Sequence, residues 1–309
     1  MMNFDPHAVG KVAVLFGGRS AERAISLKSG QAVLTALQTL AVDAHALDPA
    51  DADFFAQLQT GQFDRAFIVL HGRGGEDGVM QGMLEQLGIP YTGAGVLGSA
   101  LGMDKVRSKL IWQGVGLPTA GFVTLRGEAD LTAAAALGFP LMIKPAREGS
   151  SIGMARAETV AELTAAWQAA AQYDAEVIAE RWLPGPEYTC AILGEQALPL
   201  IRLETDHVFY DYDAKYHATT TRYHCPCGLT AAVEREIQAL CLRAFHLLGA
   251  SGWGRVDVML DAAGQATLLE INTVPGMTDH SLVPMAARVH GLSFEELVAA
   301  ILTTSQPTT

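Results

Sequence analysis

The order of hydrophobic and polar positions over the first hundred residues predicts strands that alternate with helices. An apolar run, VAVLF (12–16), ends at two glycines, and helical spacing of apolar residues follows at about 26–40. A second run, RAFIVL (65–70), ends in HGRGGEDG (71–78), and the next segment has the pattern of a helix closed by Gly88. This alternation predicts an α/β fold with a parallel sheet, whose ligands bind at the strand ends.

The pattern changes after residue 103. A helix (KVRSKLIWQG) is followed by a strand (GFVTL), an alanine-rich helix, a strand (PLMIKP), a helix and two further strands, VIAERWL and PGPEYTCAIL. We place domain boundaries near 103 and 187, which gives domains at 1–103, 104–187 and 188–309. The length agrees with several domains, because 309 residues exceed the roughly 250–300 at which a single core usually stops growing.

Composition excludes several classes of protein. Half of the residues are hydrophobic and 17% are charged, which favours packed cores over extended disorder. The net charge of −12 and the absence of a lysine and arginine run argue against a nucleic-acid partner. The start, MMNFDPHAVG, lacks the pattern of a signal peptide, and no stretch approaches the ~20 apolar residues that span a bilayer, so we expect a cytoplasmic protein without a membrane partner.

A long irregular segment at about 204–228 is rich in tyrosine, threonine, histidine and aspartate. Loops of this length are usually functional lids or disordered, and the aromatic residues favour a lid. The segment ends in HCPCG, where Cys225 and Cys227 resemble half of a zinc site. No second cysteine or histidine pair accompanies them, so we expect no zinc there. Four cysteines also do not make a disulfide framework, which fits a reducing compartment.

The segment VDVMLDAAGQATLLEIN (256–272) has two strand-like runs joined by a turn, and this predicts a β-hairpin. Pairing across the turn makes Glu270 the diagonal neighbour of Asp257 and places Arg255 directly opposite Glu270. Asn272 follows on the same face. Two carboxylates, an amide and a guanidinium are therefore expected to lie together.

Oxygen ligands of this kind suit Mg²⁺, which commonly uses one or two carboxylates together with substrate phosphates. Alternation along the hairpin predicts an apolar opposite face, formed by Val256, Val258, Leu269 and Ile271. Met259 and Leu268 interrupt the polar face. An ordinary solvated face of an edge hairpin is therefore the alternative.

A second candidate site follows the strand PLMIKP. Lys144 ends this strand, and REGSSIG (147–153) is a loop of small residues that can turn backbone N–H groups toward phosphate oxygens. Neither the Walker pattern nor the dinucleotide fingerprint is present, and a surface loop without a ligand is the alternative. Downstream, ERWLPGPE (180–187) can offer backbone groups to an adenine edge and a carboxylate to ribose, although two solvated acids are the simpler interpretation.

Four segments of the chain carry most of a similarity to one known family, namely GGRSAER (17–23), KPAREGSSIG (144–153), ERWLPGPE (180–187) and EINTVPGMTDHSLVP (270–284). Other segments also look like those of this family and occur in the expected order, namely HGRGGEDG, PYTGAG, MDKVRSK, YDYDAKY and GWGRVDVML. Together they resemble the D-alanine:D-alanine ligases of the ATP-grasp superfamily over nearly the whole chain.

This resemblance implies an N-terminal α/β domain followed by central and C-terminal domains that clasp ATP between two sheets. It implies ligation of two D-alanine molecules through a D-alanyl phosphate, with ADP and phosphate released, for peptidoglycan precursor synthesis. It also implies two Mg²⁺ ions, for which Mn²⁺ can substitute, and a homodimer formed through the N-terminal domain.

The resemblance further assigns roles to residues. For ATP these are Lys105, Lys144, Ser151, Glu180, Trp182, Leu183 and Glu187, and for Mg²⁺ they are Asp257, Glu270 and Asn272. Arg255 and the backbone N–H of Gly276 are assigned to the oxyanion. Glu22 and His71 are assigned to the first amino acid, and the second amino acid's carboxylate is assigned to Lys215, Ser281 and Leu282.

A hydrogen-bonded triad of Glu22, Ser150 and Tyr216 is implied to close the lid. Relatives that use D-lactate lack this tyrosine, so Tyr216 favours D-alanine as the second substrate. The residues support one part independently, because SLVPMAARVH looks like a helix whose first turn accepts Pro284, and a helix N-terminus favours an anion. A plain helix cap is the alternative for Ser281.

Three rival functions remain open. A related ligase can couple D-alanine to D-lactate or D-serine, and a nucleotide-binding module can keep the fold without the chemistry. A nicotinamide oxidoreductase is disfavoured because GGRSAE lacks the required glycine spacing. Arg181 departs from the family, in which lysine is common at this position, and this puts a nucleotide contact there in doubt.

Overall fold

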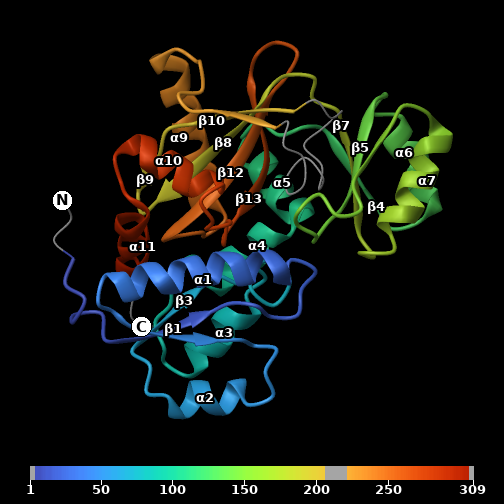
Figure 1. Ribbon diagram of the computed structural model, residues 1–309. Helices are drawn as coiled ribbons and strands as arrows, with labels where there is room; N and C mark the ends of the chain where they lie inside the picture. The colour runs from blue at the N-terminus through green and yellow to red at the C-terminus, as the bar shows by residue number, and fades with distance from the viewer. Residues whose placement is uncertain (1–3, 206–220, 306–309) are drawn as a thin grey trace.

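The computed structural model describes residues 4–205 and 221–305, which form three β-sheets with helices packed on them (Figure 1). The first sheet is parallel, in the order β2-β1-β3, and consists of Lys11–Leu15 (β1), Asp43–Leu47 (β2) and Arg65–Ile68 (β3). Its helices are α1 (Arg23–Thr39), α2 (Phe54–Thr60) and α3 (Val79–Gln86). The predicted parallel sheet is confirmed, and β2 is the strand that the pattern did not predict.

The second sheet is antiparallel, in the order β4-β7-β5-β6. Its elements are β4 (Phe122–Leu125), η1 (Glu128–Asp130), α6 (Leu131–Ala135), β5 (Leu141–Pro145), β6 (Ala155–Ala157), α7 (Val160–Ala170) and β7 (Val177–Arg181). Successive side chains on a strand point to opposite faces. In β5, Leu141 and Ile143 therefore join the core beside α7, whereas Met142 and Lys144 face a cavity on the other side.

The third sheet is also antiparallel, in the order β11-β10-β8-β12-β13, with β9 added to β8. Its strands are β8 (Glu187–Leu193), β9 (Gln196–Ala197), β10 (Ile201–Glu204), β11 (Arg222–His224), β12 (Trp253–Leu260) and β13 (Ala266–Asn272). The accompanying helices are α9 (Ala231–Leu247), α10 (Leu282–His290) and α11 (Phe294–Thr303). Helices α4 (Val96–Met103) and α5 (Lys105–Gly114) connect the first sheet to the second.

The register of the hairpin β12–β13 differs from the predicted one. Arg255 pairs with Asn272, and Asp257 pairs directly with Glu270. The predicted position of Arg255 opposite Glu270 is therefore wrong. The prediction that both carboxylates share one face is confirmed, because residues directly opposite in a pair project to the same side.

Two shifts of one residue each cause this difference: Leu260 pairs with Ala266, one residue farther along β13 than the predicted register requires, and a β-bulge follows between Val258 and Asp257. Val258 pairs with Leu268, which leaves Leu269 as an extra residue in β13. Leu268 is completely buried in the apolar core, whereas Leu269 lines the cavity together with Met259. The predicted placement of Leu269 on the apolar face and of Leu268 on the polar face is wrong, because the one-residue shift at the turn places Leu268 opposite Val258, and the bulge then returns Glu270 to the face of Asp257.

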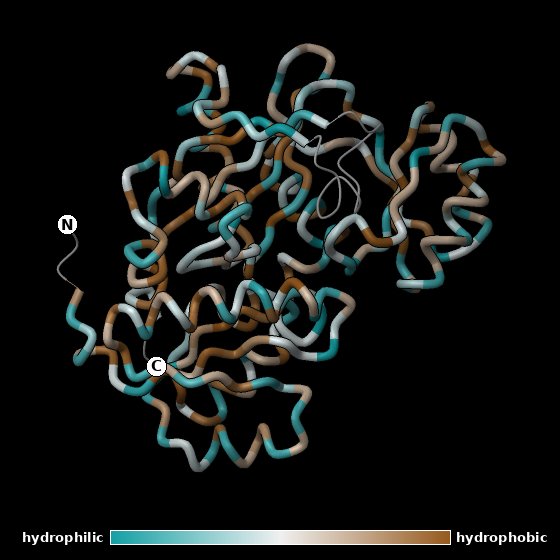
Figure 2. The backbone as a smooth tube through the Cα atoms, in the orientation of Figure 1, coloured by the Kyte–Doolittle hydropathy of each residue, from teal (hydrophilic) through white to brown (hydrophobic). Residues whose placement is uncertain are grey.

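Hydrophobic positions concentrate along the inner strands, as Figure 2 shows. One core extends from the first sheet into α11 and to Trp253 at the start of β12. The second sheet has a separate core, formed with α6 and α7. The division at residues 103 and 187 stays a prediction, since α5 packs Trp112 into the same cluster as α9. Within the described ranges, no helix combines the length and apolar character needed to cross a bilayer.

Candidate active site

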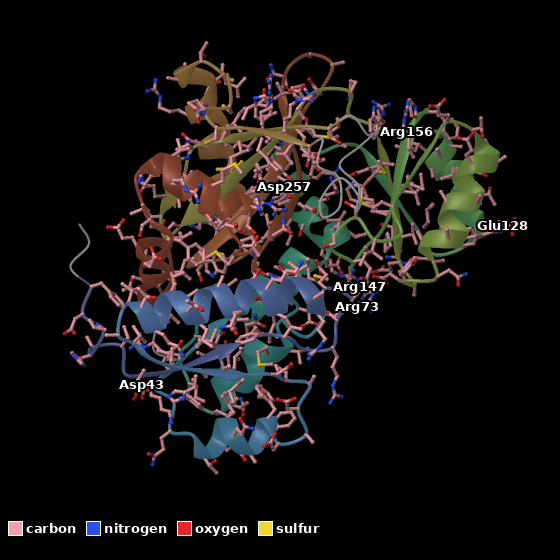
Figure 3. The ribbon with its side chains drawn as sticks, viewed as in Figure 1. Asp43, Arg73, Glu128, Arg147, Arg156 and Asp257 are labelled. Atoms are coloured by element: carbon pink, nitrogen blue, oxygen red, sulfur yellow. The ribbon has the colours of Figure 1, made fainter. Side chains whose placement is uncertain are left out.

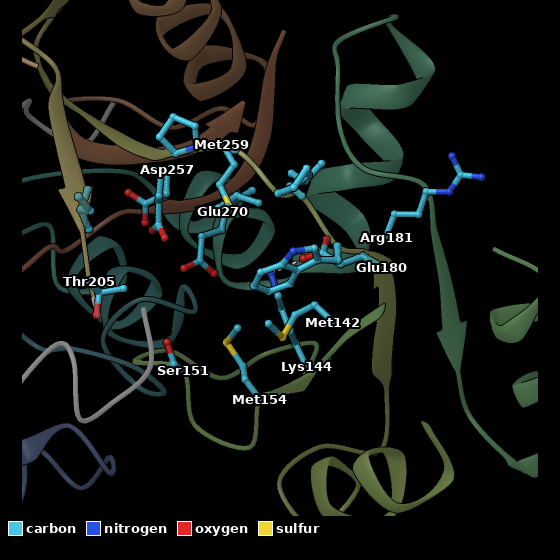
Figure 4. A pocket seen from close by; sticks show the side chains of 18 of the residues that line it. Met142, Lys144, Ser151, Met154, Glu180, Arg181, Thr205, Asp257, Met259 and Glu270 are labelled. Atoms are coloured by element: carbon cyan, nitrogen blue, oxygen red, sulfur yellow. Dashed lines mark ion pairs between the residues drawn. The ribbon is translucent and has the colours of Figure 1, made fainter. Parts of the chain in front are cut away.

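A cavity of about 380 Å³ lies between the second and third sheets (Figure 4). This volume is within the range of ~300–1,000 Å³ of small-molecule sites. Strands β5 and β7 supply one wall, and β10, β12 and β13 supply the other. The predicted residues that line this cavity are Lys144, Ser151, Glu180, Trp182, Leu183, Glu187, Asp257 and Glu270.

A buried carboxylate with two lysines forms the floor of this nucleotide cavity. Glu180 pairs with Lys144 and, at 2.9 Å, with Lys109, and all three side chains are almost completely buried. Burial alone would raise the pKa of Glu180, but the two lysines outweigh burial and lower it to about 2. Burial likewise opposes the charge on Lys144, yet Glu180 and Glu270 raise the pKa of Lys144 above its ordinary value. The cavity therefore holds fixed positive charge.

Lys105 connects the glycine- and serine-rich loop to the hairpin. Asp104 caps α5 by accepting a hydrogen bond from the N–H of Arg107, which places Lys105 at the first helical position. The Lys105 ammonium lies 2.9 Å from Glu270 Oε2 and donates to the carbonyl oxygen of Glu148 at 2.7 Å. Lys105 thus bridges two segments that surround the nucleotide cavity.

Asp257 is held by three neighbours on the polar face of the hairpin. Arg255 donates to both of its oxygens at 2.8 and 2.7 Å, and Thr189 and Asn272 donate at 2.7 and 3.1 Å. No three His, Cys, Asp or Glu side chains form a metal cluster within residues 4–205 and 221–305. Asp257, Glu270 and Asn272 nevertheless fit Mg²⁺ by their chemistry, because Mg²⁺ uses few protein carboxylates and completes its shell with phosphate and water oxygens.

A second cavity opens farther along the same polar face of the hairpin. The predicted residues that line it are Glu22, His71, Ser150, Arg255, Asn272, Gly276, Ser281 and Leu282. The polar face of the hairpin therefore borders both cavities, with Asp257 and Glu270 on the nucleotide cavity and Arg255 and Asn272 on this amino-acid cavity.

The contact predicted between Glu22 and Ser150 is present. The Ser150 hydroxyl donates to Glu22 Oε1, although the two residues come from different sheets' loops. Two glycines make room for the carboxylate, since a Cβ at Gly72 or Gly149 would lie 2.7 or 2.8 Å from Glu22 Oε2. The third predicted member, Tyr216, lies outside the described residues, as does Lys215.

His71 and Glu76 are buried at the rear of the amino-acid cavity. The His71 Nδ1 lies 2.7 Å from the carbonyl oxygen of Val274, and burial lowers the pKa of His71. Glu76 accepts from the N–H groups of Gly72 and Val274 at 2.7 and 3.1 Å. Burial and the charge of Glu22 raise the pKa of Glu76 to about 8. Both side chains therefore favour their neutral forms near neutral pH.

The helix predicted after Ser281 is α10, with Pro284 in its first turn. Ser281 occupies the N-cap position, but its hydroxyl makes no hydrogen bond to a helix N–H. It instead accepts from the backbone N–H of Thr278 at 2.9 Å. The capping bond of a plain helix cap is thus absent at Ser281, and the hydroxyl lies at the lining of the amino-acid cavity.

Charged residues that sequence reasoning did not assign join the first and second sheets. Arg73, in the loop after β3, lies 2.6 Å from Glu148 and 3.9 Å from Asp174 in the loops of the second sheet, and Arg147 holds Asp174 within that second group through two nitrogens at 3.0 and 2.6 Å. Figure 3 shows Arg73 and Arg147 near each other at this junction. Arg73 belongs to HGRGGEDG, so a charge within a glycine-rich turn was the available signal.

Lys109 and Glu76 were also not assigned, although both lie in segments that carried the family resemblance. Their burial depends on contacts distant in sequence. Arg181 points away from the nucleotide cavity in Figure 4, and its Nε donates to the carbonyl oxygen of Leu137 at 3.0 Å. The departure from lysine at this position therefore leaves the floor of the cavity intact.

Two family profiles match the chain, "D-ala D-ala ligase N-terminus" at residues 43–94 and "D-ala D-ala ligase C-terminus" at residues 111–303. A D-alanine–D-alanine ligase of Ectopseudomonas mendocina is 61% identical over 304 residues, covering 98% of this chain and 97% of that protein. One of Nitrosococcus oceani is 60% identical over 302 residues, covering 97% and 95%.

Solved structures agree with these relatives. The D-alanine–D-alanine ligase of Bacillus anthracis has a TM-score of 0.86 at 32% identity, over 96% of this chain and 97% of that one. The VanG D-Ala:D-Ser ligase of Enterococcus faecalis has a TM-score of 0.83 at 31% identity, over 96% and 99%. The chain therefore belongs to the D-alanine–D-alanine ligase family and has its ATP-grasp fold.

Proposed function

We propose that this protein joins two D-alanine molecules to form D-alanyl-D-alanine for peptidoglycan precursor synthesis, with ATP converted to ADP and phosphate. The observation that carries this proposal is the pair of cavities that border the polar face of the hairpin β12–β13. One cavity presents the buried Lys144, which is suited to a phosphate, and the other presents polar groups suited to amino acids. The polar face that both cavities share is where a phosphoryl group would pass from one to the other.

A carboxylate resists attack by an amine until one of its oxygens becomes part of a leaving group. In the first step, a carboxylate oxygen of the first D-alanine attacks the γ-phosphorus of ATP, which gives D-alanyl phosphate and ADP. Phosphoryl transfer is mainly a matter of positioning and charge neutralisation. Lys105 and Lys144 would hold the phosphates, the loop at Ser150 and Ser151 would cover them, and the adenosine would contact Glu180, Trp182, Leu183 and Glu187.

Asp257, Glu270 and Asn272 would hold Mg²⁺, as two ions, with Mn²⁺ as a possible substitute. When bound, these ions neutralise charge on the phosphate oxygens. The side chains contribute to this site by their placement on one face of the hairpin, where Arg255 contacts and orients Asp257 and Lys105 contacts and orients Glu270.

In the second step, the free amine of the second D-alanine attacks the acyl carbon, and phosphate leaves. The oxyanion formed there would be stabilised by Arg255 and the N–H of Gly276. Glu22 and His71 would hold the first amino acid. The second amino acid's carboxylate would be bound by Ser281 and Leu282 at the start of α10, where a helix N-terminus favours an anion, and by Lys215.

We propose D-alanine as the second substrate because of Tyr216, which completes a triad with Glu22 and Ser150 in the family. D-serine and D-lactate are the competing second substrates. We also propose a cytoplasmic homodimer that assembles through the first sheet's domain. Sedimentation at micromolar concentration tests the dimer, and a monomer would contradict it.

The function is tested by measuring ADP release with ATP, Mg²⁺ and D-alanine, with L-alanine as the control and with D-lactate or D-serine as added partners. Products are identified by mass. Dipeptide formation from D-alanine alone is the expected result. Release only with a mixed partner would change the assigned specificity, and no release with any partner would identify a module without chemistry.

A further inference from the structure

The loop between β13 and α10 carries Gly276, and side chains from the N-terminal part of the chain contact its backbone. Ser29, on α1, accepts a hydrogen bond from the N–H of Met277 at 3.0 Å. Glu76 accepts from the N–H of Val274 at 3.1 Å. His71 Nδ1 lies 2.7 Å from the carbonyl oxygen of Val274. The backbone is thus held on both sides of Gly276.

These contacts define the proton positions of the cluster. A carbonyl oxygen can only accept, so His71 Nδ1 must carry the hydrogen, and Nε2 of the neutral ring is then an acceptor. Nε2 lies 3.4 Å from the Ser29 hydroxyl, which can donate to it while accepting from Met277. Burial lowers the pKa of His71, which agrees with a neutral ring. From Val274 through His71 and Ser29 to Met277, each donor therefore faces an acceptor.

Burial makes the hydrogen bonds of Ser29, His71 and Glu76 to the loop unfavourable to break. Ser29 is completely buried, and His71 and Glu76 are 5% and 9% exposed. A buried N–H that loses its acceptor is left unsatisfied away from water, which is unfavourable, so the loop cannot leave these partners without a free-energy penalty. In the run 273–277 only Gly276 is partly exposed, and it lines the amino-acid cavity.

The N–H of Gly276 itself makes no hydrogen bond to any residue within 4–205 and 221–305. A Cβ at this position would lie 2.9 Å from the Ser281 hydroxyl, so the backbone passes close to the start of α10. The flanking residues are anchored while this one donor stays open toward the cavity. That arrangement is the one required of a preorganised oxyanion donor.

We propose that Ser29, His71 and Glu76 are positioning residues that fix the loop at 274–277 so that the Gly276 N–H is aimed at the developing oxyanion. This inference rests on the oxyanion role proposed for Gly276. Ser29 is the most informative of the three, because it lines neither the nucleotide cavity nor the amino-acid cavity. An effect of Ser29 on the chemistry must therefore act through the loop.

The test compares Ser29→Ala with the wild-type enzyme and with Ser99→Ala. Ser99 is a matched control, since it is also buried and its hydroxyl donates to a nearby backbone carbonyl, that of Ala94, at 3.1 Å. Two rates are measured with D-alanine: dipeptide formation, and positional isotope exchange in ATP labelled at the β,γ-bridging oxygen. The exchange reports phosphoryl transfer before the amine attacks.

We expect Ser29→Ala to lower the rate of dipeptide formation by about tenfold or more. This is part of the ~10²–10³-fold rate acceleration that an oxyanion donor supplies. Isotope exchange and ATP affinity should change by less than about twofold, and Ser99→Ala should leave both rates unchanged. Glu76→Gln provides a second variant of similar shape, whose amide oxygen can serve only one of the two N–H groups, and the same split between the rates is expected.

An equal fall in both rates would indicate a general structural role and overturn the proposal, as would unchanged dipeptide formation in both variants. Arg255→Lys is measured in parallel to separate the two assignments. If Arg255→Lys loses dipeptide formation while Ser29→Ala and Glu76→Gln keep it, the positioning role is wrong and the oxyanion site stands. If no variant loses it selectively, the oxyanion assignment itself fails.

Discussion

Replacing Lys109 with methionine tests how much the buried charges stabilise the fold. The Lys109 side chain is 1% exposed, and its ammonium contacts Glu180 Oε2 at 2.9 Å and the Thr119 hydroxyl at 2.8 Å. Methionine has a similar length and fills irregular space, so the main change is the loss of one cation from Glu180. Lys144 remains in contact with that carboxylate.

Breaking a buried ion pair by removing one partner costs about 3–5 kcal/mol. Because Lys144 still compensates Glu180, we expect Lys109→Met to lower the free energy of unfolding by about 2–3 kcal/mol. At ~2–4 °C per kcal/mol for domains of this size, the Tm should fall by about 4–12 °C.

The assay is thermal unfolding at neutral pH without nucleotide, for Lys109→Met, Glu180→Gln and the double variant. The double variant should lose less stability than the sum of the two single changes, because neither partner is then left buried without the other. Lys11→Met is the control, since its ammonium donates to the Gly61 carbonyl and pairs with no buried carboxylate in the part of the chain that the structure describes. Strictly additive losses, or a Tm within ~1 °C of wild type for Lys109→Met, would refute the reasoning.

Arg255→Lys should lower turnover by about 10²-fold while the KM for ATP changes by less than about threefold; equal effects on both constants in steady-state kinetics would contradict this. Gly149→Ala places a Cβ 2.8 Å from Glu22 Oε2 and should raise the KM for the first D-alanine by about tenfold, and an unchanged KM would argue against that carboxylate's role. Arg147 outweighs burial and holds the pKa of Asp174 below its ordinary value. Asp174→Asn should therefore lower the free energy of unfolding by about 1 kcal/mol at pH 7, a value that allows for the exposure of Arg147. In denaturant melts, the difference in this free energy between variant and wild type should vanish as pH falls through the lowered pKa of Asp174.

Periodicity along the chain predicted the elements that build the site. The apolar run in PLMIKP predicted a strand that ends at Lys144, and β5 (Leu141–Pro145) is that strand. The glycine-rich turn after Arg65–Ile68 and the helix with Pro284 in its first turn were also predicted correctly. Local patterns suffice here because each depends on side-chain direction within a single element.

The remaining features depend on contacts that local patterns do not encode. Both residues of the pair Leu268 and Leu269 are leucine, so the sequence contains no sign of which one is the bulge. Strand β2, DAHAL, has three exposed residues out of five and therefore a weak hydrophobic alternation. In the sequence, Lys109 cannot be distinguished from a lysine on the surface of a helix. Its partner Glu180 is 71 positions away, and only the folded second sheet brings the two side chains together.

One hydrophobic core joins the first and third sheets and another joins the third sheet to α9, whereas the second sheet keeps its own. Ion pairs such as Arg73–Glu148 and a small apolar cluster around Val106 and Ile178 join the second sheet to its surroundings. Amide hydrogen exchange should therefore report two cooperative units with different opening energies. Salt weakens exposed ion pairs and leaves apolar contacts intact, so rising ionic strength should speed exchange at this charged seam before it affects either core.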